Sequence, residues 1–296
     1  MGKIKSRKKA TLAVIGGSRA YDLLGARSFG KTGKKPRTLK TPFGRSAPVR
    51  MFYGEGFDYY FMSRHGEKGY EVSAPGVNYR ANVWALKKLG VERIISWSGP
   101  GAINRAMTPG MFVVPHDLID ATKNRPSNFF EGTGLGFIRM SDPFCPELRA
   151  AAVSSITTNG SICHNGGVYV CTEGPRLETP AEIRAFASWG GDLVGMTLVP
   201  EAFLARQLEM CYAAICLSTN FAEGVLPRNF KEGELFEGMM NEAEKEKVEW
   251  SLANLPAILG TFLRRISGAK RGCKCGVAMN RYRKKGLLKN PLDAAR

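Results

Sequence analysis

The chain has 296 residues, of which 44% are hydrophobic and 23% charged, a composition typical of a globular protein with a sizeable core. Its formal net charge of +17 arises almost wholly at the two ends: residues 1–10 carry five Lys or Arg and no acid, and residues 264–296 carry eleven against one acid. The body between them is nearly neutral, which argues against a basic nucleic-acid-binding surface there.

No stretch approaches 18 consecutive apolar residues, and the apolar run Leu12–Ile15 is too short for a signal peptide, so we expect no membrane association. The seven Cys stand mostly in apolar contexts, which favours reduced thiols in a cytoplasmic protein. Cys273 and Cys275 form a separate CxC pair near the C-terminus. Because no other Cys or His lies near this pair in sequence, it is a poor zinc site, and a redox or stabilising pair is the alternative.

The first predicted strand, Leu12–Ile15, ends in Gly16-Gly17-Ser18, where backbone N–H groups and a hydroxyl can approach an anion. A Gly-, Lys- and Pro-rich loop over 25–50 precedes two strands that we expect to pair, Val49–Tyr53 and Tyr59–Met62. The second strand leads into Ser63-Arg64-His65-Gly66. A guanidinium beside a titratable imidazole suits an anion, although a solvated surface turn explains it equally well.

Apolar spacing next predicts an amphipathic helix over Tyr79–Leu89, ended by Gly90. A strand at Arg93–Trp97 delivers a second small-residue loop, Ser98–Ala102, whose backbone donors can hold a polyanion. The chain then continues with a strand at Met111–Val114, a polar excursion beginning at Asp117–Asp120, and a helix over Glu147–Thr157.

The stretch from Gly167 to Ala205 predicts a strand, a polar loop, an amphipathic helix, a second strand and the start of another helix. Its polar loop carries Arg176 and Glu178 at a strand end, which is where α/β proteins place ligand chemistry. The remaining predicted elements are a helix over Glu201–Leu208, a buried strand at Tyr212–Leu217 with a terminal loop over 218–222, and a closing helix over Glu242–Arg265.

Strands that alternate with helices, without a repeat or a linker, predict one α/β domain with a central mixed, largely parallel β-sheet flanked by helices. We assign this domain to residues 11–265, between a basic N-terminal tail (1–10) and a basic C-terminal tail (266–296). Polar loops follow five of the strands, and His116 and His164 lack ligand-like spacing. A site rich in anion donors and poor in metal ligands indicates phosphate as a reactant.

Seven motifs, in matching order and spacing over residues 11–265, resemble those of the trimeric purine nucleoside phosphorylases, specifically the methylthioadenosine phosphorylase branch. They are IGGS (Ile15–Ser18), TPFG (Thr41–Gly44), SRHG (Ser63–Gly66), VNYRANVWALKKLG (Val77–Gly90), DPFCP (Asp142–Pro146), TEGPRLETPAE (Thr172–Glu182) and GMTLVPEAFLAR (Gly195–Arg206). The resemblance implies a nucleoside phosphorylase-like fold and reversible phosphorolysis in purine salvage. It also implies a homotrimer or a dimer of trimers, with inorganic phosphate as co-substrate and neither metal nor cofactor.

The resemblance also implies roles for individual residues. Phosphate would be held by Ser18, Arg64, His65, Ser98, Gly99 and Thr197, although Pro100 is unusual in its loop. His65 and Asn220 would be catalytic, and Met196 would pack under the ribose. The nucleoside would contact Leu177, Glu178, Met196, Asn220, Phe221, Ala222, Leu235 and Phe236. We expect Arg176 to hold its loop and not the substrate.

Two positions decide the base. Adenine-cleaving relatives have two aspartates where this chain has Asn220 and Ala222, and a small polar residue at the position of Glu178. An asparagine can donate to N7 or to a 6-oxo group, and a carboxylate can accept from the N1–H of hypoxanthine or guanine. We therefore predict a 6-oxopurine nucleoside (inosine, guanosine or 5′-methylthioinosine), with 5′-methylthioadenosine as the alternative. The apolar Leu235 and Phe236 would suit a methylthio group and leave the 5′ substituent open.

Two rival functions are remote. The tetrad Arg64–Glu67 also resembles the opening of the histidine phosphatases, but that chemistry places the tetrad on the first strand and needs a second catalytic His. The basic tails suggest a nucleic-acid binder, but Tyr282 is the one aromatic residue among the distal charges, so base stacking is not evident.

Overall fold

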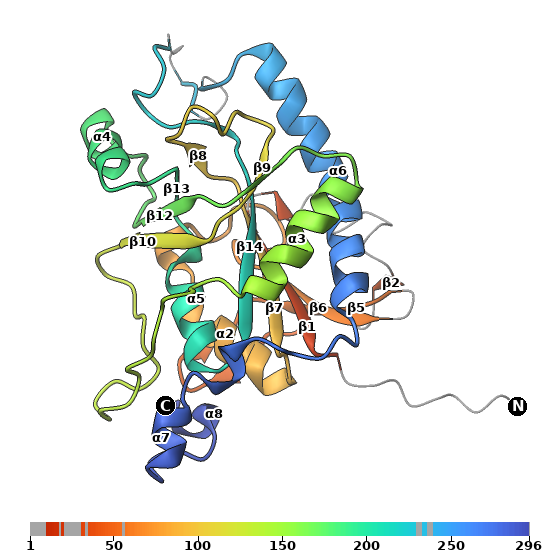
Figure 1. Cartoon of the computed structure of the whole chain (residues 1–296), viewed down its shortest axis with the longest axis vertical. Helices are drawn as coiled ribbons and strands as arrows, with labels where there is room; N and C mark the ends of the chain where they lie inside the picture. Colours follow the sequence, from red (N-terminus) through yellow and green to blue (C-terminus); the bar gives the residue numbers. More distant parts are fainter. Residues whose placement is uncertain are drawn as a thin grey trace, which may run out of the picture.

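The structure, a computed structural model, describes residues 10–17, 19–20, 31–32, 35–54, 57–228, 233–235 and 239–295. Two mixed sheets are present where the sequence predicted one: an eight-stranded sheet with the order β11-β9-β14-β7-β1-β6-β5-β2 and a five-stranded sheet with the order β10-β12-β13-β8-β15. A short pair, β3-β4, lies apart. The α/β class and the single domain are confirmed (Figure 1).

The strands are β1 (Leu12–Gly16), β2 (Lys31–Thr32), β3 (Lys40–Thr41), β4 (Gly44–Arg45), β5 (Val49–Tyr53), β6 (Asp58–Ser63), β7 (Arg93–Ser98), β8 (Gly101–Ala102), β9 (Phe112–Val114), β10 (Asp117–Ala121), β11 (Cys163–Asn165), β12 (Val168–Thr172), β13 (Leu193–Gly195), β14 (Cys211–Leu217) and β15 (Asn220–Phe221). The helices are α2 (Tyr79–Leu89), α3 (Pro146–Thr158), α4 (Pro180–Ser188), α5 (Leu198–Gln207), α6 (Glu242–Ile266), α7 (Asn280–Lys284) and α8 (Pro291–Ala294), with 3₁₀ turns at Ala74–Gly76 and Lys274–Val277.

The eight-stranded sheet is covered by helices on both faces. Every residue of its strand β14 is buried for this reason. Successive side chains of a strand point to opposite faces. Ala213, Ile215 and Leu217 join the apolar cluster that contains α3 and α6, whereas Tyr212, Ala214 and Cys216 join the cluster that contains α2 and α5. Figure 1 shows α3 and α6 side by side.

Local signals set the ends of the helices. Helix α2 has the predicted bounds: the Asn78 side chain accepts from the Ala81 N–H at its start, and Gly90 ends it at φ 94° in the left-handed region. Helix α4 begins with a capping box, in which the side chains of Thr179 and Glu182 each accept from the other's backbone N–H. These caps orient the segments that flank the polar loops.

Several short strands were not predicted: β2, β3 and β4 fall in the expected loop over 25–50, and β8 and β15 fall in the loops after β7 and β14. Two others pair with buried strands. Residues Asp117–Ala121, expected to open a polar excursion, form β10, because they pair in parallel with the buried strand β12. Cys163–Asn165, expected as part of a connecting segment, pairs in parallel with β9 as edge strand β11. Both are largely exposed on their side chains, so their apolar pattern is weak. The predicted pairing of β5 with β6 is confirmed and antiparallel.

Residues 267–295, which belong to the basic C-terminal tail (266–296) of the sequence analysis, pack against the domain. Met279, Tyr282 and Leu288 are buried in the cluster that contains α2 and α5. Arg283 pairs with Glu209 at 2.6 Å. Figure 1 shows α7 and α8 together at the lower end of the view. Because Tyr282 is 5% exposed, it is not presented for base stacking.

Among the residues that the structure describes, no helix combines the length and the apolar character needed to cross a membrane. The N-terminal tail, residues 1–9, lies outside the described ranges.

Candidate functional site

A cavity of about 270 Å³ lies where β6, β7, β12 and β13 end and where β15 begins. The predicted gathering of polar strand ends is therefore present, and nine predicted site residues share the wall of one cavity. These nine are His65, Ser98, Gly99, Leu177, Glu178, Met196, Thr197, Asn220 and Ala222.

Two hydroxyls predicted to hold phosphate meet on one side of the cavity. The Oγ of Ser98, at the end of β7, lies 3.2 Å from the Oγ1 of Thr197 and 3.1 Å from the Tyr169 hydroxyl. Thr197 stands at the N-terminal end of α5 without capping it, so its hydroxyl remains directed to Ser98. Together they form a pair of hydroxyls that can donate to an anion.

His65 lines the cavity with a neutral imidazole. Its Nδ1 lies 2.9 Å from the Val72 carbonyl oxygen, and since a carbonyl only accepts, Nδ1 carries the proton. Burial first, and then the charge of Arg64, lower the pKa of His65 to about 4. The neutral ring therefore directs Nε2 as an acceptor. The ring also lies against Tyr70, with 4.6 Å between ring centroids.

Arg64 lies behind the cavity and not in its wall. Its Nε and Nη2 pair with Glu201 at 2.8 Å each, Nη2 also donates to the Oγ of Ser96, and Nη1 donates to the Trp97 carbonyl. The second Nη1 hydrogen has no acceptor among the described parts of the chain. A Cβ added at Gly17 would lie 2.9 Å from Nη1, so this hydrogen is close to the glycine turn after β1. The geometry leaves at most one N–H of Arg64 for phosphate.

Glu178 is a buried carboxyl in the wall of the cavity. The Thr172 hydroxyl, at the end of β12, donates to its Oε1 at 2.5 Å. Burial raises the pKa of Glu178 above its ordinary value, and the hydrogen bond from Thr172 opposes that shift. A carboxylate in this setting gains from any further donor that a ligand supplies.

Asn220 is oriented by its neighbours. Its Oδ1 accepts from the Thr219 hydroxyl at 2.7 Å, and its Nδ2 donates to the Phe221 carbonyl at 2.9 Å. The other Nδ2 contact is the Met239 sulfur at 3.5 Å, and a thioether is a weak acceptor. One amide hydrogen is therefore directed to a partner that a ligand can replace.

Two further predicted residues do not line the cavity, and two more lie outside the described residues. Phe221 lines a neighbouring cavity together with Pro180 and Arg228, and not the main one. Leu235 is 52% exposed and does not line the cavity. Ser18 and Phe236 lie outside the described residues.

The cavity also has walls that sequence reasoning missed: Tyr70, Ser73, Ala74, Gly101, Pro175, Val194, Gly195, Glu223 and Met239. Several of them lie one to five residues from a predicted site residue in the sequence, so their closeness to the motifs could have identified them. Met239 carried no such signal, because it belongs to none of the motifs.

Arg125 is a further residue that the sequence did not reveal. Its side chain is 2% exposed, and its Nη1 donates to the carbonyls of Met196 and Val199 at 2.5 and 2.7 Å. Its Nη2 donates to the carbonyls of Thr172 and Glu173 at 3.1 and 2.6 Å. One guanidinium thus ties the end of β12 to the segment that carries Met196, which positions two walls of the cavity.

Arg176, by contrast, behaves as expected. It pairs with Glu182 at 2.7 Å and donates to the Leu177 carbonyl at 3.0 Å, and its side chain is 63% exposed. It holds the loop and does not line the cavity.

The described wall therefore divides into two chemical halves. Hydroxyls, the glycine backbone of the Ser98 loop and the imidazole of His65 suit an oxyanion. Glu178 and Asn220 suit a planar polar ligand that both donates and accepts. In the described ranges, the only group of three or more metal-ligating side chains consists of cysteines that do not line this cavity.

Comparison with known proteins agrees with these features. A family model described as the phosphorylase superfamily matches residues 11–263. The chain is 42% identical over 254 residues to the 6-oxopurine nucleoside phosphorylase of Pyrococcus furiosus, covering 83% of this chain and 92% of that protein. It is also 42% identical over 238 residues to a probable S-methyl-5′-thioinosine phosphorylase of Methanothermobacter thermautotrophicus, covering 80% of this chain and 81% of that protein.

Solved structures show the same architecture. A methylthioadenosine phosphorylase sourced from an antarctic soil metagenomic library has a TM-score of 0.82 at 28% identity, covering 98% of this chain and 96% of that one. Methylthioadenosine phosphorylase from Schistosoma mansoni in complex with tubercidin has a TM-score of 0.76 at 26% identity, covering 97% and 99%.

Proposed function

The chain belongs to the phosphorylase superfamily, and we propose that its cavity catalyses the reversible phosphorolysis of a 6-oxopurine nucleoside. The enzyme is then a pentosyltransferase of purine salvage, as are the relatives named for 6-oxopurine nucleosides and methylthioinosine. The observation that carries the proposal is the buried Glu178 in the same cavity wall as Asn220.

The reaction exchanges one bond at C1′ for another. A phosphate oxygen bonds to C1′ as the C1′–N9 bond breaks, and the electron pair of that bond moves onto the purine. The products are the free base, once protonated, and a ribose-1-phosphate or its methylthio counterpart. The protein's task is to align phosphate below the sugar and to stabilise negative charge on the departing base.

The phosphate half consists of Ser98, Gly99, Thr197 and His65, with one N–H of Arg64. Ser18, which lies outside the described residues, is the further donor that the family resemblance implies. Because neutral His65 directs Nε2 as an acceptor, it suits the P–OH of hydrogen phosphate. Donors from separate strand ends hold phosphate in one orientation, which raises its effective concentration near C1′.

The base half consists of Glu178 and Asn220. Glu178 accepts from N1–H of hypoxanthine or guanine, and the amide hydrogen of Asn220 that now faces Met239 donates to N7 or to the 6-oxo oxygen. Adenine has an acceptor at N1, so the buried carboxylate would face an acceptor and receive no hydrogen bond from the base, at a cost of about 1–3 kcal/mol. This favours 6-oxopurines over the 5′-methylthioadenosine alternative.

The sugar is covered by Met196 and Met239, both in the cavity wall. A thioether wall accepts a methylthio group as readily as a hydroxymethyl group. An assay with inosine, guanosine and 5′-methylthioinosine therefore determines which 5′ substituent the enzyme prefers.

We also propose a homotrimer or a dimer of trimers in the cytoplasm, without a metal or cofactor in the reaction. Large apolar side chains such as Phe137 and Trp189 are 76% and 60% exposed in the single chain, and subunit contacts commonly cover such side chains. The seven cysteines are all free thiols, which agrees with a reducing compartment. Light scattering coupled to gel filtration measures the subunit number directly.

The decisive experiment is phosphate-dependent release of free base from inosine, guanosine, 5′-methylthioinosine, adenosine and 5′-methylthioadenosine. We expect the three 6-oxopurine nucleosides to be cleaved faster, with no release when phosphate is omitted. Faster cleavage of the two adenine nucleosides would overturn the assignment of Glu178. Phosphate release from a phosphomonoester would instead support the histidine phosphatase alternative.

A further inference from the structure

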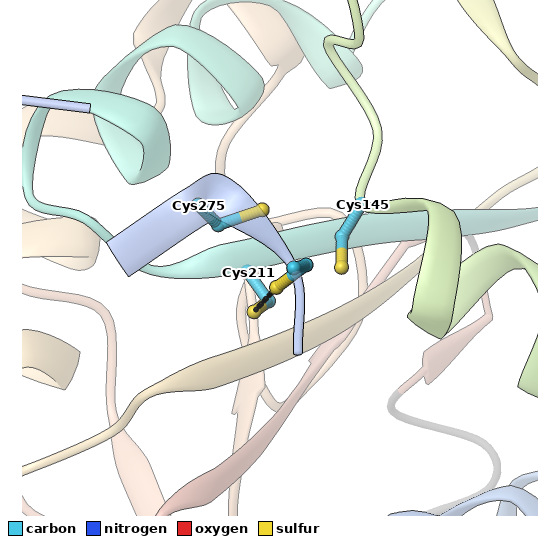
Figure 2. A group of neighbouring side chains, drawn as sticks. Cys145, Cys211 and Cys275 are labelled. Carbon is cyan, nitrogen blue, oxygen red and sulfur yellow. Dashed lines mark hydrogen bonds between the residues drawn. The ribbon is translucent and has the colours of Figure 1, made fainter. Parts of the chain in front are cut away.

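Four cysteines from three distant parts of the chain meet at the amino end of β14. Cys145 precedes α3, Cys211 is the first residue of β14, and Cys273 and Cys275 come from the C-terminal segment. All four sulfur atoms lie within 4.8 Å of one another. Figure 2 shows the labelled sulfurs of Cys145, Cys211 and Cys275 directed into one small volume. The CxC pair, which has no partner nearby in sequence, thus gains two more thiols in space.

The separations fit a tetrahedral metal. Four sulfurs at about 2.3 Å from a zinc ion stand about 3.8 Å from one another. The sulfurs of Cys211 and Cys273 are 3.3 Å apart and no two of the four sulfurs are more than 4.8 Å apart, which is compatible with that value. A disulfide would need two sulfurs at about 2.0 Å and would use the four in pairs. We propose that the four cysteines bind one Zn²⁺ ion in a closed structural site.

The surroundings offset the charge of such a site. Four thiolates around Zn²⁺ carry a net charge of −2, and two cations approach the sulfurs. Arg206 donates from Nη1 to the Cys275 sulfur at 3.5 Å, and the Arg271 side chain hydrogen-bonds the Cys273 sulfur. Cys145 stands at the N-terminal end of α3, where the helix dipole favours a thiolate. Three of the four cysteines are buried, which shields the ion from competing water.

Zinc binding is an exchange of protons for metal without redox chemistry. Each thiol that becomes a ligand forms a Zn–S bond and gives its proton to water. Thiolate sets of this kind select zinc or iron among the common metals, and a closed set of four protein ligands leaves no position for substrate. The site is therefore structural.

Its place in the fold indicates what it stabilises. Cys211 begins β14, a strand about 20 Å long, and Asn220 lies beyond its other end. The ion would tie the C-terminal segment to β14 and α3, at the end of the sheet opposite the cavity. We expect zinc loss to lower stability and to leave the base preference unchanged.

The experiment measures metal in the full-length protein, purified with a thiol reductant and without a metal-affinity tag. Inductively coupled plasma mass spectrometry should find about one zinc ion per chain. Cys273→Ser and Cys275→Ser should each lose most of it. Cys163→Ser is the matched control, because Cys163 is a half-buried cysteine on β11 outside the cluster, and it should retain zinc.

A second measurement does not depend on the variants folding. Wild-type protein stripped of metal and loaded with Co²⁺ should show the intense visible bands of a tetrahedral tetrathiolate complex. Zinc below about 0.1 per chain after incubation with ZnCl₂ would overturn the proposal. So would iron in place of zinc, or an intact mass lowered by about 2 Da for each disulfide among these cysteines.

Discussion

Arg64 and Glu201, 137 positions apart in the chain, form a bidentate ion pair whose side chains are 0% and 1% exposed. Glu201 also accepts from the Tyr212 hydroxyl at 2.7 Å, and Arg64 donates further to Ser96 and Trp97. Burial alone would lower the pKa of Arg64, but the adjacent carboxylate raises it, so the guanidinium remains charged. The cation expected to bind phosphate is thus first a structural partner of a buried acid.

From this pair we predict that removing Glu201 destabilises the protein much more than removing the exposed Glu249. Glu201→Ala leaves a buried guanidinium without its counter-charge, so the free energy of unfolding should fall by about 3–5 kcal/mol. Glu249→Ala is the matched control, since Glu249 pairs with Arg19 at 2.5 Å on the surface and should change stability by about 0–1 kcal/mol. Urea unfolding measures both, and similar losses in the two variants would contradict the structural role of the pair.

His65 predicts a pH-dependent stability. Its pKa is lowered to about 4 in the folded chain, against about 6.5 when unfolded, so between these values the unfolded state binds more protons. Stability should therefore decrease as pH falls from 6.5 toward 4, by about 2 kcal/mol between pH 7 and pH 5 from this group alone. Thermal unfolding of wild type and His65→Asn in phosphate-free buffer measures the difference.

His164→Asn is the control for that experiment, because His164 is exposed on β11. If wild type and His65→Asn lose stability equally on acidification, the imidazole is not the group that responds.

Glu178 predicts a change of base preference. Glu178→Gln removes the carboxylate that accepts from N1–H, so kcat/KM for inosine should fall by about 10- to 100-fold, while that for adenosine falls less. Glu223 is the other carboxylate of the described cavity wall, and Glu223→Gln should leave the ratio of kcat/KM for inosine and adenosine unchanged. Steady-state kinetics with both nucleosides give the ratios, and parallel losses for the two bases would contradict the assignment. Asn220→Asp should also move the preference toward adenine nucleosides.

Arg125 predicts a positioning effect. Arg125→Ala leaves the carbonyls of Met196 and Val199 without their donor, so the segment that holds Thr197 should lose its alignment. We expect KM for phosphate to rise by about tenfold, because alignment contributes strongly to such sites. Arg125→Lys should recover only part, since an ammonium lacks the planar fork.

Arg105→Ala provides the comparison, because Arg105 also donates to a backbone carbonyl, that of Val225 at 2.7 Å, but at an exposed position. An equal rise of KM in the Arg105 and Arg125 variants would show that the clamp does not position the phosphate wall.

Much of this protein follows from short-range sequence patterns. The 3.6-residue spacing and the terminal glycine of Tyr79–Leu89 are sufficient for helix α2. The loops after strands indicate most of the nine site residues that share the cavity, whereas Leu177 and Ala222 were predicted only through the family resemblance. Such signals are local: they depend on a few neighbouring side chains and on the rule that parallel strands end at a common edge. The presence of Glu178, where adenine-cleaving relatives have a small polar residue, can likewise be read directly from the sequence.

The tertiary structure decided what depends on partners far apart in the chain. It set Arg64 against Glu201, aimed Arg125 at four carbonyls, and brought Cys145 and Cys211 to the CxC pair. It also packed residues 267–295 against the cluster that contains α2 and α5, although their charge marks them in the sequence as a basic tail. The reason is physical: burial and pairing of a charge or thiol depend on which distant segment packs beside it, and no local pattern contains that information.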